Sequence, residues 1–292
     1  MNATKYKLIV SDLDGTLLNG KSALTERTVS AIRRFRQAGG LFTIATGRAE
    51  DSARVFAARA GIDIPIISYN GGKIINLADG KVIFETFLDG DLAIRAFRSL
   101  RSNKKDVVAY VDNYRYVEDY SPVIDRYVAR IRNSVNIVDD IARIAVAAHR
   151  SVDATKIADH RSADAAKAAA PNRVFKKLLI LDPKQEDELL LRIIQPIFGD
   201  ALNFEKSSPE YYEIMPPNTS KGRALSILAD CLGVGIGQTA AIGDHINDVS
   251  MLKAAGLGVA VANAVPEALA AASRITASND DDGAAQFIES LI

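Results

Sequence analysis

Short apolar runs alternate with amphipathic segments over the first 72 residues of the chain. Each apolar run has the Val, Ile and Leu content of a strand that is buried on both faces of a sheet. Between the first two runs, Val29, Ile32 and Phe35 recur at helical spacing, and Gly39 is placed to end that helix. This alternation predicts a parallel sheet with right-handed crossovers. The expected strands lie in residues 7–12, 41–48 and 64–72, and the expected helices lie in residues 25–40 and 51–61.

The pattern changes after residue 72. Residues 73–87 resemble a hairpin with its turn at Asp79-Gly80, and a mixture of hairpins and helices follows as far as residue 216. After Pro216-Pro217 the alternation of helix and buried strand returns. We therefore predict an α/β core from residues 1–84 and 217–292, interrupted by an inserted α+β domain at residues 85–216 with its own antiparallel sheet. Two connections at one edge of the core would form a hinge.

Within the insertion, the expected elements are a hairpin around Asp112-Asn113, helices at 121–134 and 185–198, and strands at 176–182, 201–205 and 211–215.

Residues 139–173 stand apart because they are rich in Ala and charge and poor in large apolar side chains. They predict a surface helix pair or a partly mobile excursion. His149 with Asp153, and His160 with Asp164, have the i, i+4 spacing of metal ligands. Such pairs commonly lie on a solvated helix face, so we expect no metal there.

The overall composition is that of a globular protein. The 292 residues are 48% hydrophobic and 25% charged, and 36 basic residues balance 36 acidic ones. This balance gives no field that would attract nucleic acid or an anionic membrane. The single Cys231 excludes an intrachain disulfide, favours a reducing compartment, and lies in an apolar helical stretch where we expect a buried thiol. With no long apolar stretch and no room for a signal peptide, we expect a cytoplasmic protein.

Polar side chains follow several of the predicted core strands. Because the carboxyl ends of parallel strands share one edge of a sheet, these side chains should converge there. Carboxylates suit Mg²⁺, while a hydroxyl, an ammonium group and the N–H groups at helix starts suit a phosphoryl group. The residues concerned are Asp12, Asp14, Thr46, Lys221, Asp244, Asn247 and Asp248.

Four segments carry a resemblance to a known family. The stretches DLDGTLL, TIATGR, SKG and GDHINDVSML resemble the four motifs of the haloacid dehalogenase superfamily, and NGG at 70–72 fits its Cof-type branch of phosphatases. The resemblance implies a Rossmann-like doubly wound parallel sheet core with an inserted type IIB α+β cap domain. His245 departs from the family pattern, and we expect it to face solvent. Asn70 and Gly71 are candidates for the floor of the site or for a hinge.

The resemblance also implies roles for individual residues. Asp12 would be the nucleophile, and Asp14 the general acid and base. Mg²⁺ would be the cofactor, with carboxylates from Asp12 and Asp244, the backbone carbonyl of Asp14, and support from Asp248. The implied phosphate- and substrate-binding residues are Leu13, Thr46, Gly47, Arg48, Lys221 and Asn247. Arg48 is also an unfavourable cation at a helix start, which favours a role in anion binding.

The implied function is a Mg²⁺-dependent phosphatase that hydrolyses small phosphorylated metabolites through an aspartyl-phosphate. Sugar phosphates, pyridoxal phosphate and flavin mononucleotide are all compatible with the motifs as substrates, with no nucleic-acid or membrane partner. A phosphomutase of the same superfamily is one alternative, because it uses the same pair of aspartates. A phosphoacceptor signalling module is another, although the DLDGT turn and the large insertion argue against it.

Overall fold

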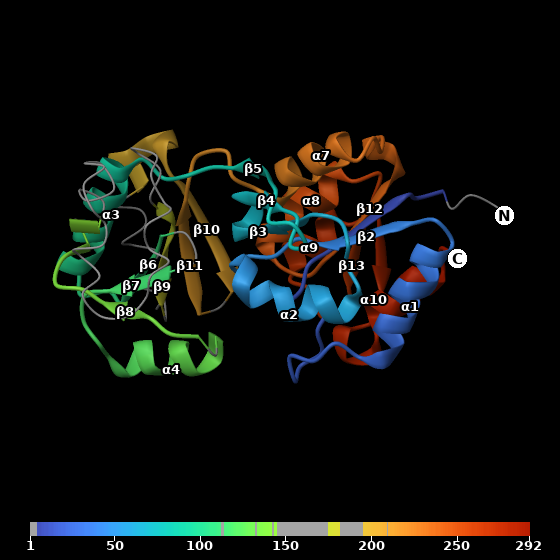
Figure 1. Cartoon of the computed structure of the whole chain (residues 1–292), viewed down its shortest axis with the longest axis horizontal. Helices are drawn as coiled ribbons and strands as arrows, with labels where there is room; N and C mark the ends of the chain where they lie inside the picture. Colours follow the sequence, from blue (N-terminus) through green and yellow to red (C-terminus); the bar gives the residue numbers. More distant parts are fainter. Residues whose placement is uncertain are drawn as a thin grey trace. The chain divides into compact units, whose positions relative to one another are not determined.

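The computed structural model describes residues 5–111, 114–131, 133–141, 143–144, 175–181, 195–208 and 210–292. These residues form two compact units (Figure 1). The core unit comprises Met1–Glu85 and Asn218–Ile292, and the inserted unit comprises Thr86–Pro217. The pairs His149–Asp153 and His160–Asp164, the turn at Asp112-Asn113 and most of the helix expected at 185–198 lie outside the described residues, as do residues 145–173 of the Ala-rich segment.

A five-stranded parallel sheet forms the centre of the core unit, as expected. Its first strand pairs on both sides: Leu8 lies opposite Thr239 on one neighbour and Leu41 on the other. All residues of the two central strands are buried. The strand order is β14 (Arg274–Thr276), β13 (Leu257–Val261), β12 (Thr239–Gly243), β1 (Leu8–Ser11) and β2 (Leu41–Ile44).

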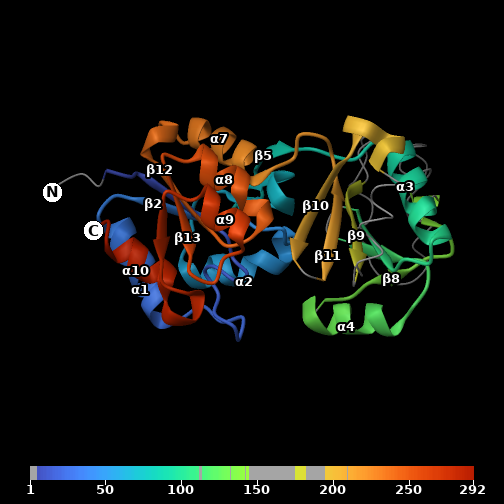
Figure 2. The same cartoon turned by 180° about the vertical axis from the view of Figure 1, so that it is seen from behind.

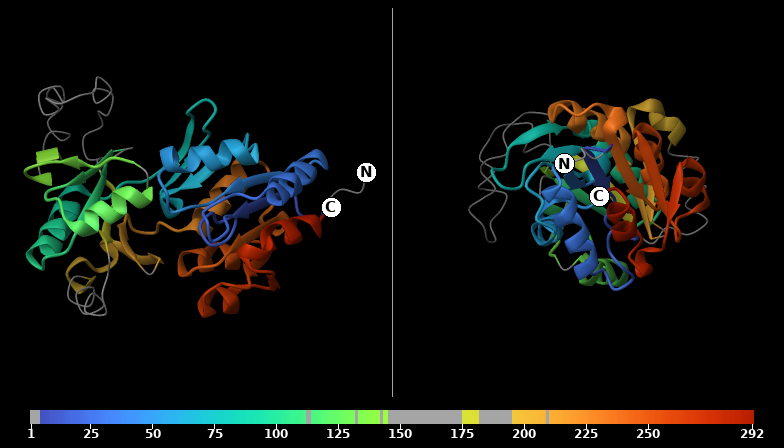
Figure 3. Two further views of the ribbon diagram at one scale, coloured as in Figure 1. Left: turned by 90° about the horizontal axis from the view of Figure 1, so that it is seen from below. Right: turned by 90° about the vertical axis from the view of Figure 1, so that its right-hand side faces the viewer.

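Helices cover this sheet (Figures 2 and 3). Each crossover from a strand through a helix to the next parallel strand is right-handed. The chain moves from β1 to β2 in one direction across the sheet and from β12 to β13 in the other, so the two sets of helices lie on opposite faces. Accordingly α1 lies beside α2 and α10, whereas α8 contacts both α7 and α9. The bounds are α1 Glu26–Gln37, α2 Glu50–Ala60, α7 Lys221–Cys231, α8 Val249–Ala254, α9 Pro266–Ala271 and α10 Gly283–Glu289, with 3₁₀ turns η1 Tyr69–Gly71, η5 Ile236–Gln238, η6 Ile246–Asp248 and η7 Asn279–Asp281.

The third predicted strand is only partly a member of the parallel sheet. β3 (Ile66–Ser68) reaches it through a single parallel bridge between Ala45 and Ile67. The η1 turn then reverses the chain, so β3 pairs antiparallel with β4 (Lys73–Ile75), which pairs with β5 (Val82–Glu85). The β4–β5 hairpin and its turn at Asp79-Gly80 are confirmed, with Gly80 at φ +73°.

The inserted unit contains a six-stranded sheet in the order β10, β11, β9, β6, β7, β8. Its pairs are antiparallel as predicted, except that β8 joins β7 in parallel. One face packs against α3 (Gly90–Ser102), a helix that the sequence analysis missed, through Ala93, Phe97 and Leu100. The remaining bounds are β6 Val107–Val111, β7 Tyr114–Val117, α4 Pro122–Ile131, β8 Asn136–Ile137, β9 Phe175–Leu181, η4 Gly199–Ala201, β10 Asn203–Ser208 and β11 Tyr211–Met215.

The expectation of a buried Cys231 thiol is wrong. Cys231 is the last residue of α7 and is exposed, because it lies at the edge of the buried arc that Leu225, Leu228 and Ala229 occupy. In the described part of the chain, no helix combines the length and apolar character needed to cross a membrane.

Candidate active site

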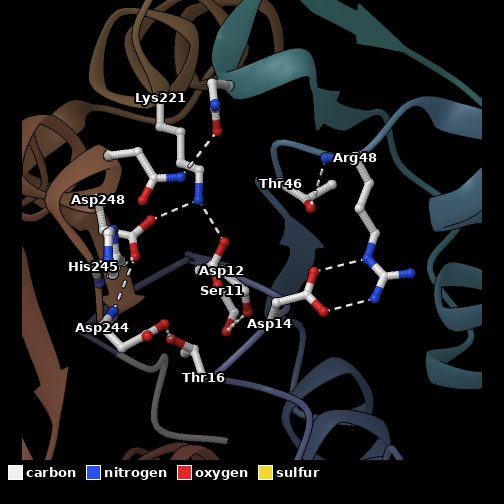
Figure 4. A network of polar contacts seen from close by, with 12 residues as sticks. Ser11, Asp12, Asp14, Thr16, Thr46, Arg48, Lys221, Asp244, His245 and Asp248 are labelled. Atoms are coloured by element: carbon white, nitrogen blue, oxygen red, sulfur yellow. Dashed lines mark hydrogen bonds and ion pairs between the residues drawn. The ribbon is translucent and has the colours of Figure 1, made fainter. Parts of the chain in front are cut away.

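The first motif forms a tight turn directly after β1. The Asp12 N–H donates to the Ile242 carbonyl oxygen at 2.8 Å, which continues the pairing with β12. The buried Leu13 then accepts hydrogen bonds at its carbonyl from Leu17 N (3.1 Å) and Leu18 N (2.9 Å). This turn ends the strand at the sheet edge, with the Asp12 side chain directed toward Lys221 and the Asp14 side chain toward Arg48 (Figure 4).

Gly15 allows that turn to approach the fourth motif. Its φ of +86° is a left-handed conformation that favours glycine. A Cβ atom at this position would lie 2.5 Å from Oδ2 of Asp244, so any side chain would displace that carboxylate. The glycine therefore brings the first and fourth motifs together.

Lys221 joins the nucleophile candidate to the fourth motif. It is the first residue of α7, which Ser220 caps by accepting from the Arg223 N–H at 3.2 Å. The fully buried Nζ of Lys221 donates to Oδ1 of Asp12 and, at 2.6 Å, to Oδ1 of Asp248 (Figure 4). Burial by itself lowers the pKa of Lys221, but the carboxylates of Asp12 and Asp248 outweigh it and raise that pKa above its usual value.

Asp248 uses both carboxylate oxygens within the protein. Oδ1 accepts from Lys221, and Oδ2 accepts from the backbone N–H groups of Asp244 (2.9 Å) and His245 (3.0 Å). Gly243 makes this possible, because a Cβ there would lie 2.5 Å from Cβ of Asp248. Asp248 thus fixes the loop after β12 and, at the same time, the direction of the Lys221 side chain.

Asp12, Asp244 and Asp248 form an acidic cluster that fits a divalent cation. Each offers one carboxylate oxygen, and these atoms lie within 4.8 Å of one another. Burial, followed by the neighbouring Asp248, raises the pKa of Asp244 to about 7. Burial also raises the pKa of Asp12 well above its usual value, although Lys221 opposes this. A hard cation would neutralise the negative charges of these crowded, buried carboxylates. Their oxygen atoms are ligands that suit Mg²⁺.

Thr46, Gly47 and Arg48 lie beyond the end of β2. The buried Thr46 accepts from the Arg48 N–H at its Oγ1 (3.1 Å), and Gly47 between them is partly buried. The Arg48 side chain pairs with the carboxylate of Asp14 (Figure 4). Through Arg48, the second motif therefore contacts Asp14, the acid–base candidate of the first motif.

Asn247 lies in the η6 turn and is 6% exposed. Its Nδ2 donates at 3.0 Å to Oδ1 of Asn70, the residue proposed for the site floor. His245, which we expected to face solvent, is only partly exposed, and its ring Nδ1 is buried. The structure thus assembles every site residue predicted in the core unit around the carboxyl ends of β1, β2 and β12.

The sequence analysis missed two residues that support the site. The Thr16 hydroxyl donates to Oδ1 of Asp244, and Asn263 Nδ2 donates to the Gly15 carbonyl at 2.8 Å. Thr16 could have been found, since it directly follows Gly15 in the first motif. Asn263 follows the end of β13 and belongs to none of the four motifs, so its contact with Gly15 comes from the fold.

The chain is similar to several known proteins over nearly its whole length. A family model described as haloacid dehalogenase-like hydrolase matches residues 9–288. The chain is 30% identical to a 5-amino-6-(5-phospho-D-ribitylamino)uracil phosphatase of Bacillus subtilis, over 98% of both chains. It is 28% identical to a pyridoxal phosphate phosphatase of Escherichia coli, over 97% of this chain and 98% of the other. A crystal structure of a haloacid dehalogenase-like hydrolase from Bacteroides thetaiotaomicron superimposes with a TM-score of 0.81 at 27% identity, covering 98% of this chain and 100% of that one.

Proposed function

Because the chain belongs to the haloacid dehalogenase-like hydrolases and is a phosphatase of that family, we propose that it hydrolyses small phosphorylated metabolites with Mg²⁺ through an aspartyl-phosphate. One observation carries the proposal. The buried Lys221 ammonium is shared by Asp12 and Asp248, and the Asp244 carboxylate completes the acidic cluster around Asp12. This arrangement supplies a nucleophilic oxygen, a fixed positive charge and cation ligands at one strand edge.

Asp12 and Asp244 would hold the cation, together with the backbone carbonyl of Asp14. Asp248, the third member of the acidic cluster, would also orient Lys221 and the loop after β12, because its oxygens accept hydrogen bonds from both. When bound, Mg²⁺ would offset the negative charge that the phosphate and the carboxylates bring together. Lys221 would contribute a second, permanent positive charge to the phosphoryl oxygens.

In the first step, a carboxylate oxygen of Asp12 forms a bond to phosphorus while the bond from phosphorus to the alcohol oxygen breaks. Asp14 gives its proton to the departing alkoxide. In the second step, Asp14 takes a proton from a water molecule whose oxygen attacks phosphorus. The bond from phosphorus to the Asp12 oxygen then breaks, and inorganic phosphate is released. Thr46, Gly47, Leu13 and Asn247 would orient the phosphoryl group throughout.

The relatives support small organic phosphate monoesters as the substrate class. One is named for a phosphorylated ribitylaminouracil and the other for pyridoxal phosphate. We therefore propose sugar phosphates and phosphorylated cofactors as substrates of this chain. The cytoplasmic location expected from the single cysteine stays a prediction.

A panel of sugar phosphates, pyridoxal phosphate and flavin mononucleotide tests the proposal by release of inorganic phosphate. We expect turnover with Mg²⁺, loss of turnover in EDTA, and loss of turnover in Asp12→Asn with native circular dichroism. Asp230→Asn, at an exposed position of α7, is the matched control and should keep wild-type rates. A phosphomutase would return the phosphoryl group to a sugar without releasing phosphate. Undiminished release in EDTA or in Asp12→Asn would contradict the proposal.

A further inference from the structure

The η1 turn has an unusual backbone for residues that do no assigned chemistry. Tyr69 and Asn70 both have φ of +51°, and Gly71 follows with φ of +97°. A left-handed conformation is uncommon for a residue other than glycine, and it is costly for a bulky side chain such as tyrosine. Two such residues in succession therefore persist only because the surrounding structure holds them. Strain of this kind concentrates at functional sites.

The turn contacts the second motif through its backbone. The Asn70 N–H donates to the Thr46 carbonyl at 3.0 Å, and the Tyr69 N–H donates to the Arg48 carbonyl at 3.1 Å. These bonds fix the segment that carries the Thr46 hydroxyl. The positive φ values allow the chain to make both bonds and then turn back into β4.

The same turn packs against the helix that begins with Lys221. A Cβ atom on Gly71 would lie 2.2 Å from the Ser220 carbonyl oxygen and 3.1 Å from the Lys221 nitrogen. Only a glycine allows this approach, so the backbone of η1 rests directly on the first residues of α7. Any shift of the turn would move the origin of the Lys221 side chain.

The third connection is the amide pair of Asn70 and Asn247. Asn70 is fully buried and accepts from Asn247 Nδ2 at 3.0 Å. The pair leaves Asn70 Nδ2 and Asn247 Oδ1 buried without a hydrogen-bond partner. Whichever way the two amides are turned, one N–H₂ group and one carbonyl oxygen stay unmatched. Such groups are costly in the protein interior, so the pair has one donor and one acceptor position to offer to an ordered water or a bound group.

We infer that Asn70 is a positioning residue for the phosphoryl group, because it joins the second motif to the fourth while the adjoining Gly71 rests on the third. It acts through Asn247 and through the start of α7, so that Lys221 and Thr46 keep their places relative to Asp12. This inference rests on the proposed phosphatase function. It assigns a role to a residue outside the four motifs.

Four variants test the inference with p-nitrophenyl phosphate and Mg²⁺: Asn70→Gly, Asn247→Ala, their double variant, and Ser22→Gly as a control. Asn70→Gly keeps the left-handed backbone accessible and removes only the amide. Ser22 is an exposed residue with φ of +54°, so Ser22→Gly makes the same change of backbone freedom away from the site. The inhibition constant of orthovanadate, a phosphate mimic, is measured beside kcat/KM because it does not depend on the fraction of active protein.

We expect each single variant to lose about 10-fold in kcat/KM, and the double variant to lose about 10-fold rather than about 100-fold, as for residues that act as one pair. The orthovanadate inhibition constant should rise in parallel, and Ser22→Gly should match the wild type. Wild-type kinetics in Asn70→Gly would overturn the inference, as would losses that multiply in the double variant. A lower kcat with an unchanged inhibition constant would show a merely structural role and would also overturn it.

Failure of the proposed function can be distinguished from failure of this inference. If the wild type shows neither turnover nor thermal stabilisation by orthovanadate with Mg²⁺, the phosphatase proposal and this inference fall together. If the wild type turns over and Asn70→Gly does so equally well, only the inference falls.

Discussion

Arg48 donates two hydrogen bonds to the carboxylate of Asp14, from Nε at 2.7 Å and from Nη2 at 2.6 Å. Its guanidinium also stacks on the ring of Phe56, 5.0 Å from the ring centre. This two-bond geometry is specific to arginine and orients a carboxylate more strictly than a single charge would. We therefore expect Arg48 to orient the acid–base residue, and direct anion binding, which its place in the sequence suggested, is the alternative.

Arg48→Lys keeps the charge and removes the paired geometry. We expect it to lower kcat on a sugar phosphate by about 10-fold and kcat on p-nitrophenyl phosphate by much less, because only the sugar alkoxide needs the proton of Asp14. Arg54→Lys, at an exposed position of α2, is the control. A rise in KM that is equal for both substrates would instead show that Arg48 binds the phosphate.

Asp14→Asn separates the two half-reactions. p-Nitrophenolate leaves without a proton, so the first step should survive, whereas activation of water needs the carboxylate. A rapid-quench experiment should show a burst near one equivalent of nitrophenol and then slow turnover. The absence of a burst, with equal losses on both substrate types, would make Asp14 a metal ligand or a structural residue only.

Gly15→Ala tests the close approach of the first motif to Asp244. An alanine there meets both an unfavourable φ of +86° and the Asp244 carboxylate. Gly80→Ala is the matched control, because it has φ of +73° and nothing within 4 Å of the added Cβ. Both variants should lose about 1 kcal/mol of stability from the strained backbone, as non-glycine residues do at such positions. Only Gly15→Ala should also lose most of its activity, and equal activity in the two variants would refute the packing argument.

The stability of the metal-free protein should depend on the protonation of Asp244. Its pKa rises from 3.8 to about 7 on folding, so between these values the folded state binds a proton that the unfolded state lacks. By linkage, this contribution makes the free energy of unfolding fall as the pH rises through that interval. In EDTA, the melting temperature of the wild type should fall more between about pH 5 and about pH 8 than the melting temperature of Asp244→Asn.

Mg²⁺ should then raise the melting temperature more at the higher pH, since cation ligands must be deprotonated. Identical pH slopes in the wild type and Asp244→Asn would show that the carboxylate does not titrate as described.

The sequence predicted most of the core unit because its signals are local. Buried strands of Leu, Ile and Val end in polar residues, and such strand ends meet at one edge of a parallel sheet. What local signals cannot contain is the partner of a side chain. The pairing of Arg48 with Asp14 and the bond from Asn263 to Gly15 join residues 34 and 248 positions apart. The helix α3 was missed although its signals are local, since Asp89 caps its start and Ala93, Phe97 and Leu100 recur at helical spacing.

The motif did not indicate that Asp248 holds both Lys221 and the loop after β12. Asp248 remains a predicted member of the metal site, and the structure adds that one of its oxygens accepts from the loop backbone and the other from Lys221. The spacing itself was a usable signal, since Asp248 stands three residues after His245 and its side chain accepts from the His245 N–H, as the third residue of a capping box does.

The central claim is that Asp12 carries the phosphoryl group during the reaction. Its most direct test is intact-mass and peptide mass spectrometry of Asp14→Asn, quenched in acid during turnover of p-nitrophenyl phosphate with Mg²⁺. We predict that the protein gains the mass of one phosphoryl group and that the modification maps to Asp12. The added mass should be absent from the variant that also carries Asp12→Asn. Phosphate release without any added mass, or the same mass on a different residue, would contradict the account.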